Sequence, residues 1–309
     1  MGVAQVERAP QCHGVLVTFR RPEPLVRMLE ALAAQTRPLD RLVVVDNAPT
    51  AANREAVARL APGAEYVAAA DNLGPAGGLA LGMERLLPAA HDVDWIFTLD
   101  DDDPPPFPTL FAALLGYARD ASARDRSVGA VGADGVRCDR RRGRMVWVPD
   151  EALRGDVDVD VVGGDFFPCY SVAALRAVGP VRADLFFGFE ELELGLRLRD
   201  AGYRIVLSGA LCRSWREATD QLGVTVVPSR ALGPLTWRRY YSLRNLVRVL
   251  LDHGAPLGAL RVSLVVGLAK PLANVGRAPG PALAHLRSNV RALRDAWSGR
   301  LGRTVEPVS

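Results

Sequence analysis

Short apolar runs alternate with segments of helical spacing in the N-terminal third of the chain, and this alternation restricts the fold more than any other feature. The apolar runs are predicted strands, at residues 14–18, 41–46, 65–69 and 94–99. Helical spacing of apolar residues occurs between them, at residues 24–35, 51–60 and 77–87. Strands that alternate with helices predict a mainly parallel sheet covered by helices. Ligands of such sheets bind at the carboxyl ends of the strands, which here carry Thr18, Asp46, Asn72 and Asp100.

The pattern changes after residue 103. Hairpin or edge strands of a mixed sheet are predicted at residues 128–133, 145–148 and 156–162. Two helices and a strand would close the domain, at residues 171–178, 190–201 and 204–207. Only helical patterns follow, at about 238–252, 257–273 and 281–298. We therefore divide the chain into an N-terminal extension (1–13), an α/β domain (14–236) and a helical C-terminal region (237–309).

Composition and charge exclude several classes of protein. The chain has 309 residues, of which 38 are basic and 35 acidic, and this balance does not predict nucleic-acid binding. Only one basic residue is lysine, which indicates the coding bias of a high-GC bacterial genome. Four cysteines are scattered singly, without the spacing of a zinc site or a disulfide framework, and this favours a reducing cytoplasm. We expect neither a signal peptide nor a spanning helix, since Arg261, Lys270 and Pro271 interrupt the longest apolar stretch.

Four consecutive carboxylates, Asp100 to Asp103, directly follow a predicted buried strand and precede three prolines. Carboxylate oxygens are the ligands that Mg²⁺ and Mn²⁺ prefer, and two carboxylates can hold one cation while leaving coordination positions for phosphate oxygens. The alternative is a solvated acidic loop. Because the strand delivers these side chains to the ligand-binding edge of the sheet, the sequence favours a cation site.

Two further segments could take part in a site. Residues 71–78 are rich in glycine and open a helix, so their amides could bind a diphosphate, although ordinary turns and helix caps use the same residues. Glu190, Glu191 and Glu193 begin another predicted helix. Acidic residues in a first turn commonly interact only with the helix dipole, but a carboxylate within hydrogen-bond reach can also take a proton from a hydroxyl nucleophile.

The motifs together resemble, in order and spacing, those of the family 2 glycosyltransferases of GT-A fold, with the greatest likeness to the galactofuranosyl- and rhamnosyltransferase branch. The likeness covers about residues 14 to 215, and a Tyr240-Tyr241 with Arg244-Asn245 element is similar to one in the helical tails of that branch. The motifs are Val17-Thr-Phe-Arg20, Val44-Val-Asp-Asn47, Asn72-Leu-Gly74 with Gly77-Gly78, Leu99-Asp-Asp-Asp102, Gly163-Gly164, Phe186-Phe-Gly-Phe-Glu-Glu-Leu-Glu193 and Ala201-Gly-Tyr-Arg-Ile205.

The resemblance implies a role for each matching residue. Glu191 would be the general base, and Asp100 and Asp102 would bind a divalent cation, Mg²⁺ or Mn²⁺. The implied donor-binding residues are Thr18, Phe19, Arg20, Asp46, Asn47, Asn72, Gly77, Gly78, Asp100 and Asp101. The implied acceptor-binding residues are Asp165, Glu190 and Glu193, although Asp165 could equally be a turn carboxylate. The motif set requires Asp46, Asn72, Asp102 and Glu191 to surround one cleft.

The sequence departs from the family pattern at two places. Glu191 stands where the family usually has Asp, so the base would reach one methylene farther. A histidine metal ligand is common after the strand that follows the base helix, but residues 208–215 contain none. Cys212 or Ser214 could face the metal instead, or only Asp100, Asp102 and the diphosphate would hold it. We therefore expect metal dependence to be weak.

The function that the resemblance implies is inverting sugar transfer from a UDP- or dTDP-sugar to an acceptor hydroxyl. The alternatives are a non-catalytic scaffold that binds nucleotide sugars and a nucleotidyltransferase. The C-terminal region has eleven basic and two acidic residues over 237–300, interleaved with apolar ones. This surface could bind anionic lipid and deliver the site to an envelope acceptor. Alternatively it packs on the catalytic domain or on a second subunit, and the acceptor is a soluble secondary metabolite.

Overall fold

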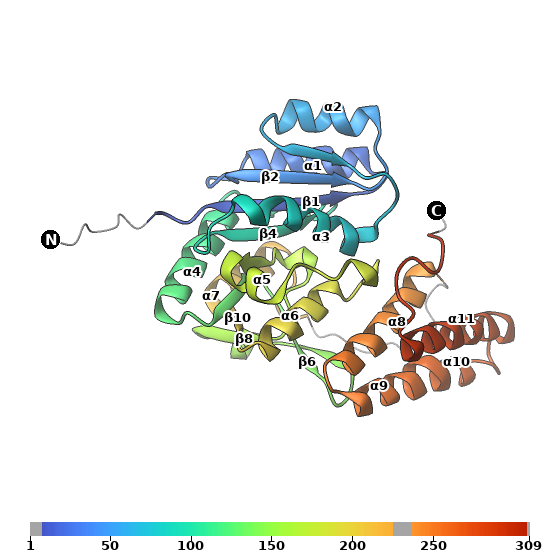
Figure 1. The fold of residues 1–309 in the computed structure, drawn as a ribbon. Coiled ribbons are helices and arrows are strands. Elements are labelled where there is room, and N and C mark those ends of the chain that lie inside the picture. Colours follow the sequence, from blue (N-terminus) through green and yellow to red (C-terminus); the bar gives the residue numbers. More distant parts are fainter. Residues whose placement is uncertain (1–7, 225–235, 308–309) are drawn as a thin grey trace.

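A computed structural model describes residues 8–224 and 236–307 (Figure 1). Its centre is an eight-stranded sheet of order β3-β2-β1-β4-β9-β5-β10-β8. The first four strands pair in parallel and agree with the predicted ones to within two residues at each end: β1 Cys12–Thr18, β2 Arg41–Asp46, β3 Glu65–Ala68 and β4 Trp95–Asp100. The predicted N-terminal extension is two residues too long, because Cys12 and His13 already belong to β1 and are buried.

The helices between these strands cover both faces of the sheet. They are α1 Pro22–Ala33, α2 Ala51–Leu60 and α3 Gly74–Leu86. In Figure 1, α3 lies in front of the sheet and α1 behind it, as right-handed crossovers require for this strand order. Glycines let α3 approach β1 closely, since a Cβ on Gly82 would lie 2.2 Å from Val15 Cγ1 and one on Gly78 would lie 2.8 Å from Val17 Cγ1.

The second half of the sheet is mixed. Its strands are β5 Val128–Gly132, β8 Asp156–Val159, β9 Cys169–Ser171 and β10 Arg204–Ser208. Strand β9 runs antiparallel between β4 and β5, and β8 runs antiparallel to β10. A separate hairpin consists of β6 Val136–Asp139 and β7 Arg144–Trp147. The helices here are α4 Leu110–Arg124, α5 Val172–Val178, α6 Glu190–Asp200 and α7 Gly209–Ala218, of which α4 and α7 were not predicted.

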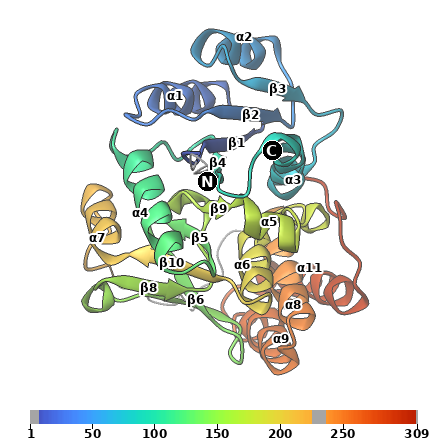
Figure 2. The same ribbon diagram turned by 60° about the vertical axis from the view of Figure 1, so that its left-hand side comes forward.

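The C-terminal region forms a second, smaller core beside α6 (Figures 1 and 2). Its helices are α8 Trp237–Asp252, α9 Pro256–Val262, α10 Lys270–Leu272 and α11 Pro279–Ser298. A π-helix at Ser263–Ala269 joins α9 to α10, where one helix was expected over 257–273. After α11 the chain returns along α8 through residues 299–307, which we call the strap. Within it, Arg303 donates a hydrogen bond of 2.7 Å to Asp71.

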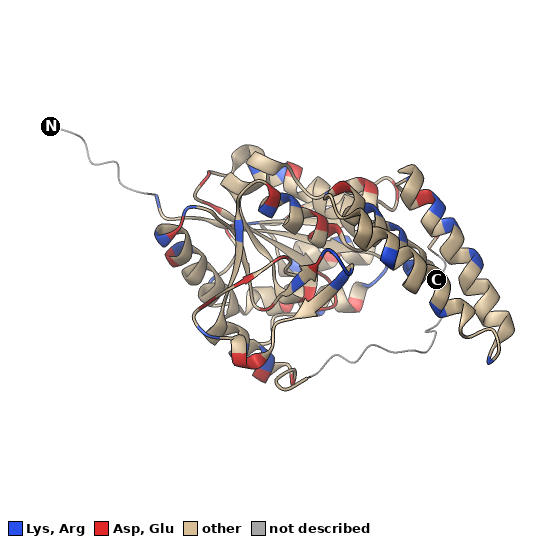
Figure 3. Cartoon of the chain, turned by 90° about the horizontal axis from the view of Figure 1, so that it is seen from below, with Lys and Arg blue, Asp and Glu red and all other residues tan. Residues whose placement is uncertain are grey.

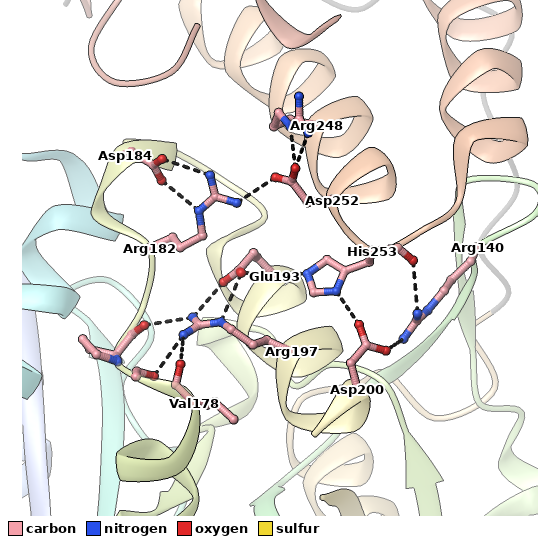
Figure 4. Close-up of polar contacts among 12 residues, drawn as sticks. Arg140, Val178, Arg182, Asp184, Glu193, Arg197, Asp200, Arg248, Asp252 and His253 are labelled. Atoms are coloured by element: carbon pink, nitrogen blue, oxygen red, sulfur yellow. Dashed lines mark hydrogen bonds and ion pairs between the residues drawn. The ribbon is translucent and has the colours of Figure 1, made fainter. Parts of the chain in front are cut away.

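Polar contacts join the C-terminal helices to α6 (Figure 4). His253 Nδ1 lies 2.6 Å from Asp200 Oδ2, and Arg140 from the hairpin turn binds the other oxygen of Asp200 at 2.9 Å. Arg182 binds Asp252 at 2.8 Å. These contacts and the second apolar core hold the helical region against the α/β domain.

Large apolar side chains remain exposed on the C-terminal helices. They are Leu257, Leu260, Leu264, Val265, Val266, Leu272, Leu283, Val290 and Trp297. Figure 3 shows mostly basic residues among the charged positions of these helices. Within residues 8–224 and 236–307, none of the helices combines the length and the hydropathy needed to span a bilayer.

Candidate active site

A cleft of about 690 Å³ opens at the carboxyl ends of β1 and β4. The ends of these strands, the loop after β3, the start of α6, the start of α8 and the strap all contribute to its wall. Ten of the residues that the sequence singled out line it: Thr18, Phe19, Arg20, Asn47, Asn72, Asp100, Asp101, Asp102, Glu190 and Glu191. The strand ends therefore bring together most of the predicted site, across 173 positions of sequence from Thr18 to Glu191.

The acidic run after β4 forms one side of this cleft. Asp101 is buried and accepts a hydrogen bond of 2.6 Å from Thr18 Oγ1. Arg21 also donates to Asp101, at 3.4 Å, and forms an ion pair with Asp102. Burial and the nearby carboxylates of Glu191, Asp102 and Asp103 raise the pKa of Asp100 to about 8. The cleft therefore concentrates negative charge that Arg21 balances only in part.

Asp100 and Glu191 meet at one glycine. A Cβ placed on Gly164 would lie 2.5 Å from Asp100 Oδ2 and 3.4 Å from Glu191 Oε1, so both carboxylates lie close to this residue. Burial, with the adjacent carboxylate of Glu190, raises the pKa of Glu191. Glu190 Oε2 is buried and has no hydrogen-bond partner within the described residues. The start of α6 thus places carboxylates with spare acceptor capacity directly beside Asp100.

The loop of residues 72–74 lies opposite the strand ends and is held by two asparagines. Asn47 Nδ2 donates to Gly74 O at 3.0 Å, and Asn47 Oδ1 accepts from Leu73 N at 3.2 Å. Asn72 Oδ1 accepts from Gly74 N at 2.9 Å. Gly74 has a φ of +69° and touches the Phe186 carbonyl so closely that a Cβ would lie 2.0 Å from its oxygen. This loop is therefore fixed against the segment that precedes α6.

Asp46 does not line the cleft, contrary to the sequence prediction. Its side chain is fully buried. Asn53 Nδ2 and the Tyr66 hydroxyl both donate to Oδ2, at 2.8 and 2.7 Å, and Ala48 N donates to Oδ1 at 2.9 Å. Because these donors already occupy the carboxylate, Asp46 ties α2 and β3 to the end of β2. Only Asn72, Asp102 and Glu191 of the four residues expected around one cleft line it.

Gly77 and Gly78 are buried in the packing of α3 and are absent from the cleft wall. A Cβ on Gly77 would lie 2.7 Å from Leu73 Cβ, and one on Gly78 would meet Val17 and Asn47. Their glycine character therefore serves close packing instead of a diphosphate site. Of the residues predicted to bind a diphosphate through their amides, Asn72 and Gly74 line the cleft.

The acceptor-side predictions are also corrected in part. Glu193 is buried away from the cleft and forms an ion pair with Arg197 at 2.8 Å (Figure 4). His253 Nε2 lies 3.8 Å from the other oxygen of the same carboxylate. Its position two residues after Glu191 turns its side chain to another face of α6. Asp165 does not line the cleft, although burial and Asp103 raise its pKa to about 6.

Neither candidate substitute for the missing histidine reaches the cleft. Cys212 is fully buried on α7, where burial and Asp134 raise the pKa of its thiol. The hydroxyl of Ser214 donates to Ala210 O at 3.2 Å. The helix that follows β10 therefore carries both residues away from the acidic run.

Several cleft residues were not predicted as site residues, among them Arg21, Phe187, Trp237 and Arg238. Phe187 and Trp237 pack edge to face with ring centroids 4.7 Å apart. The Arg238 guanidinium lies 5.3 Å from the Phe187 ring centroid and 5.5 Å from that of Trp237. Only tertiary folding brings α8 to the cleft, so local sequence patterns gave no signal for Trp237 and Arg238. Arg21 had a signal, because it directly follows the Thr18 motif.

Part of the chain that forms this cleft is similar to known proteins. The family model described as "Glycosyl transferase family 2" matches residues 15–148, which contain the strand ends and the acidic run. Residues 15–148 are thus similar to glycosyl transferase family 2. The chain is also 34% identical over 198 residues to galactofuranosyltransferase GlfT1 of Mycobacterium tuberculosis, and 34% identical over 202 residues to GlfT1 of Mycolicibacterium smegmatis. Each match covers 61% of this chain and spans 64% and 65% of the respective relative.

Solved glycosyltransferase structures share the fold. A mannosyltransferase from Pyrobaculum calidifontis, in complex with GDP-Man and Mn²⁺, superposes with a TM-score of 0.52 at 18% identity and covers 94% of this chain and 76% of its own. GalNAc-T7, with UDP, GalNAc and Mn²⁺, gives a TM-score of 0.60 at 13% identity and covers 94% and 58%. The predicted GT-A fold, with a mixed, mainly parallel sheet and a C-terminal helical appendage, is confirmed.

The oxygen donors of the acidic run suit a divalent cation. Within the described residues, no group of three or more His, Cys, Asp or Glu side chains is arranged to hold a metal. Mg²⁺ nevertheless needs only one or two protein carboxylates when substrate phosphates and waters supply the other ligands. Asp100 and Asp102 offer hard oxygen donors at the cleft.

Proposed function

We propose that the chain is an inverting glycosyltransferase that moves a sugar from a nucleoside diphosphate donor to an acceptor hydroxyl. The observation that carries this proposal is the contact of both Asp100 and Glu191 with Gly164, at the edge of a cleft whose opposite wall is the loop of residues 72–74. This arrangement puts a candidate base next to a candidate diphosphate site. The family 2 match and the GlfT1 relatives support the same class of reaction.

In the proposed reaction, Glu191 takes the proton of the acceptor hydroxyl while the acceptor oxygen attacks the anomeric carbon. The bond between that carbon and the diphosphate oxygen breaks, and the nucleoside diphosphate leaves with the bonding electrons. One displacement inverts the configuration and needs no covalent intermediate. The raised pKa of Glu191 suits this role, because general bases work best when their pKa lies near the operating pH.

Asp100 and Asp102 would hold a divalent cation, Mg²⁺ or Mn²⁺, which would supply positive charge to the leaving diphosphate. Arg20 lines the cleft beside them and has no carboxylate partner among the contacts of the described residues, so its guanidinium is available to a phosphate. Asn72 and Asn47 keep the facing loop in place. Phe187 and Trp237 offer an apolar surface to the acceptor near Glu190 and Glu191.

Metal and diphosphate binding should depend on each other. We expect Asp100→Ala and Asp102→Ala to weaken UDP or dTDP affinity by about tenfold or more in the presence of Mn²⁺, since each removes a charged oxygen ligand. Isothermal titration calorimetry measures this effect. Asp103→Ala is the matched control, because Asp103 belongs to the same acidic run but does not line the cleft. Equal affinities in wild type with metal, wild type with chelator and Asp102→Ala would refute the cation site.

A donor screen tests the proposed function as a whole. Purified protein is incubated with UDP- and dTDP-sugars, and the release of nucleoside diphosphate is measured with and without acceptor alcohols. Release supports a glycosyltransferase. Donor binding without turnover would indicate a scaffold, and pyrophosphate as product would indicate a nucleotidyltransferase.

We further propose that the C-terminal helices bring the cleft to an anionic lipid surface that presents the acceptor. The exposed apolar residues of these helices include Leu257, which is 73% exposed, and Leu264, which is 51% exposed. They occur within a segment that has eleven basic residues and two acidic ones. Apolar insertion and attraction to anionic headgroups act together in such surfaces.

Liposome flotation checks this membrane contact. We expect the wild type to float with anionic liposomes at low salt and to dissociate as added salt screens the arginines. Leu257→Glu should lower the partition coefficient by about tenfold, because it removes one inserted apolar side chain. Val93→Glu is the matched control, since Val93 is 52% exposed on the α/β domain. Absence of binding at low salt would favour a soluble acceptor or a contact with a second subunit.

A further inference from the structure

We infer that Arg244 and Asn245, on α8, are positioning residues that hold the segment leading into α6 and thereby set the location of Glu190 and Glu191. This inference deepens the proposed function and rests on it. Both residues lie outside the part of the chain that the family model matches. Neither touches the cleft, so their effect would be transmitted through the backbone of residues 185–189, which we call the aromatic loop.

The aromatic loop has an unusual backbone conformation. Phe186 has a φ of +62°, Gly188 of +79° and Phe189 of +68°. Positive φ costs a non-glycine residue on the order of 1 kcal/mol or more, so it persists only where the surroundings enforce it. Phe189 is the residue directly before α6, and the two carboxylates follow it immediately. The start of α6 therefore depends on contacts that hold this loop in place.

Asn245 supplies the largest set of those contacts. Its side chain is fully buried, and its Nδ2 donates to the carbonyl oxygens of Leu185, Phe187 and Gly188 at 2.9, 2.9 and 2.8 Å. The two N–H groups of this amide are thus shared among three carbonyls of the loop. Leu185 O also accepts from Phe187 N and from Arg244, so removing the Asn245 amide would mainly take a donor from the carbonyls of Phe187 and Gly188.

Arg244 orients this amide and adds a second donor. Its Nε donates to Asn245 Oδ1 at 2.9 Å, so the Nδ2 side of the amide faces the loop. Its Nη2 donates to Leu185 O at 2.8 Å. Its Nη1 donates to Gly302 O at 2.7 Å and so ties the strap to the same point. The guanidinium lies 4.7 Å from the Tyr241 ring centroid. A fully buried guanidinium is costly unless its donors are used, and here they bind the Asn245 amide, the strap and Leu185 O of the loop.

The other side of the aromatic loop touches the loop of residues 72–74. Phe186 O accepts a hydrogen bond from Ala76 N at 3.4 Å and lies against Gly74. The Phe186 ring packs on Tyr241 with centroids 4.9 Å apart. The aromatic loop is therefore held between the candidate donor loop and α8. Arg244 and Asn245 set the distance between the candidate base and the candidate donor site.

Asn245→Ala tests this role. We expect kcat to fall by about tenfold or more, because a misplacement near 1 Å is enough to lower the rate by that factor, while the donor KM changes little. Asn289→Ala is the matched control. Asn289 is equally buried in the C-terminal region and donates to Gly267 O at 2.8 Å, far from the aromatic loop in sequence and contacts. A purely structural role would lower the unfolding temperature of both variants and leave kcat unchanged in both.

Two further measurements keep the test decisive. Arg244→Lys keeps the charge but loses the planar guanidinium, so it should also lower kcat. This variant provides the test if Asn245→Ala does not fold. Amide hydrogen exchange of residues 185–191 should accelerate in either variant relative to Asn289→Ala, and this readout does not require activity. A wild type without turnover would refute the proposed function alone. Unchanged exchange, or a kcat within twofold of wild type in folded Asn245→Ala and Arg244→Lys, would refute the positioning role.

Discussion

Replacing Glu191 with Gln is expected to lower kcat for sugar transfer by about 100- to 10,000-fold, the range over which a positioned general base accelerates a reaction. The amide keeps the size of the side chain and one hydrogen-bond acceptor oxygen. It is not basic enough to take the proton from the hydroxyl of the acceptor. Donor affinity should stay within about threefold of wild type, because the donor contacts lie on the strand ends and the facing loop. Steady-state kinetics with a saturating acceptor, together with nucleotide titration, measures both quantities.

Glu193→Gln is the matched control for this change. Glu193 lies on the same helix but faces Arg197 and His253, so the substitution should lower stability and leave the chemical step largely intact. If Glu191→Gln retains full activity, the base is another group. If both variants lose activity equally, α6 has been disturbed as a whole, and the base assignment is then not supported.

Replacing Arg216 with Met is expected to destabilise the protein by about 3–5 kcal/mol, the usual cost of leaving one member of a buried ion pair without its partner. Arg216 is 1% exposed and Asp134 is fully buried. The guanidinium binds Asp134 through two hydrogen bonds, of 2.6 and 2.9 Å, and also binds Val148 O and Asp150. It thereby ties α7 to the end of β5 and to the hairpin. Urea unfolding followed by circular dichroism measures the loss.

The exposed pair of Arg124 and Asp156 provides the comparison. Their side chains are 57% and 43% exposed, so Arg124→Met should cost less than about 1 kcal/mol. Arg216→Met combined with Asp134→Leu should regain most of the lost stability, since no charge is then left buried alone. A loss of less than 1 kcal/mol in Arg216→Met would show that the buried pair contributes little to folding.

The parallel half of the sheet could be predicted from the sequence because its signals are local. Strands β1, β2 and β4 are buried apolar runs, and each ends in a polar residue that the strand direction places at one edge. The acidic run was predicted at this edge for the same reason, whereas the role of Glu191 came from the resemblance of its motif to a known family. Asp46 was expected at the cleft because its position at the end of β2 was clear, whereas its burial by Asn53 and Tyr66 depends on side chains from two later elements.

The missed features depend on long-range packing. Helix α4 carries buried residues at helical spacing, but the prolines and acidic residues before it conceal where it begins. Strand β9 has three residues, too few for any periodicity, and exists because β4 and β5 both pair with it. The Arg244 and Asn245 contacts join α8 to a loop about 60 positions earlier. Sequence patterns contain no information on such contacts.

The strap affects when the cleft becomes complete during synthesis of the chain. Arg303 binds Asp71 across 232 positions of sequence, and Pro307 contributes to the wall of the cleft. During synthesis the α/β domain leaves the ribosome first, and domains generally begin to fold in that order. The sheet and its acidic run would therefore form before Arg244 and Asn245 of α8 are present to donate hydrogen bonds to the aromatic loop. A nascent chain that ends before residue 237 has the carboxylates of the cleft but lacks the side chains that hold the aromatic loop, so we expect binding and turnover to arise only after the C-terminal helices emerge.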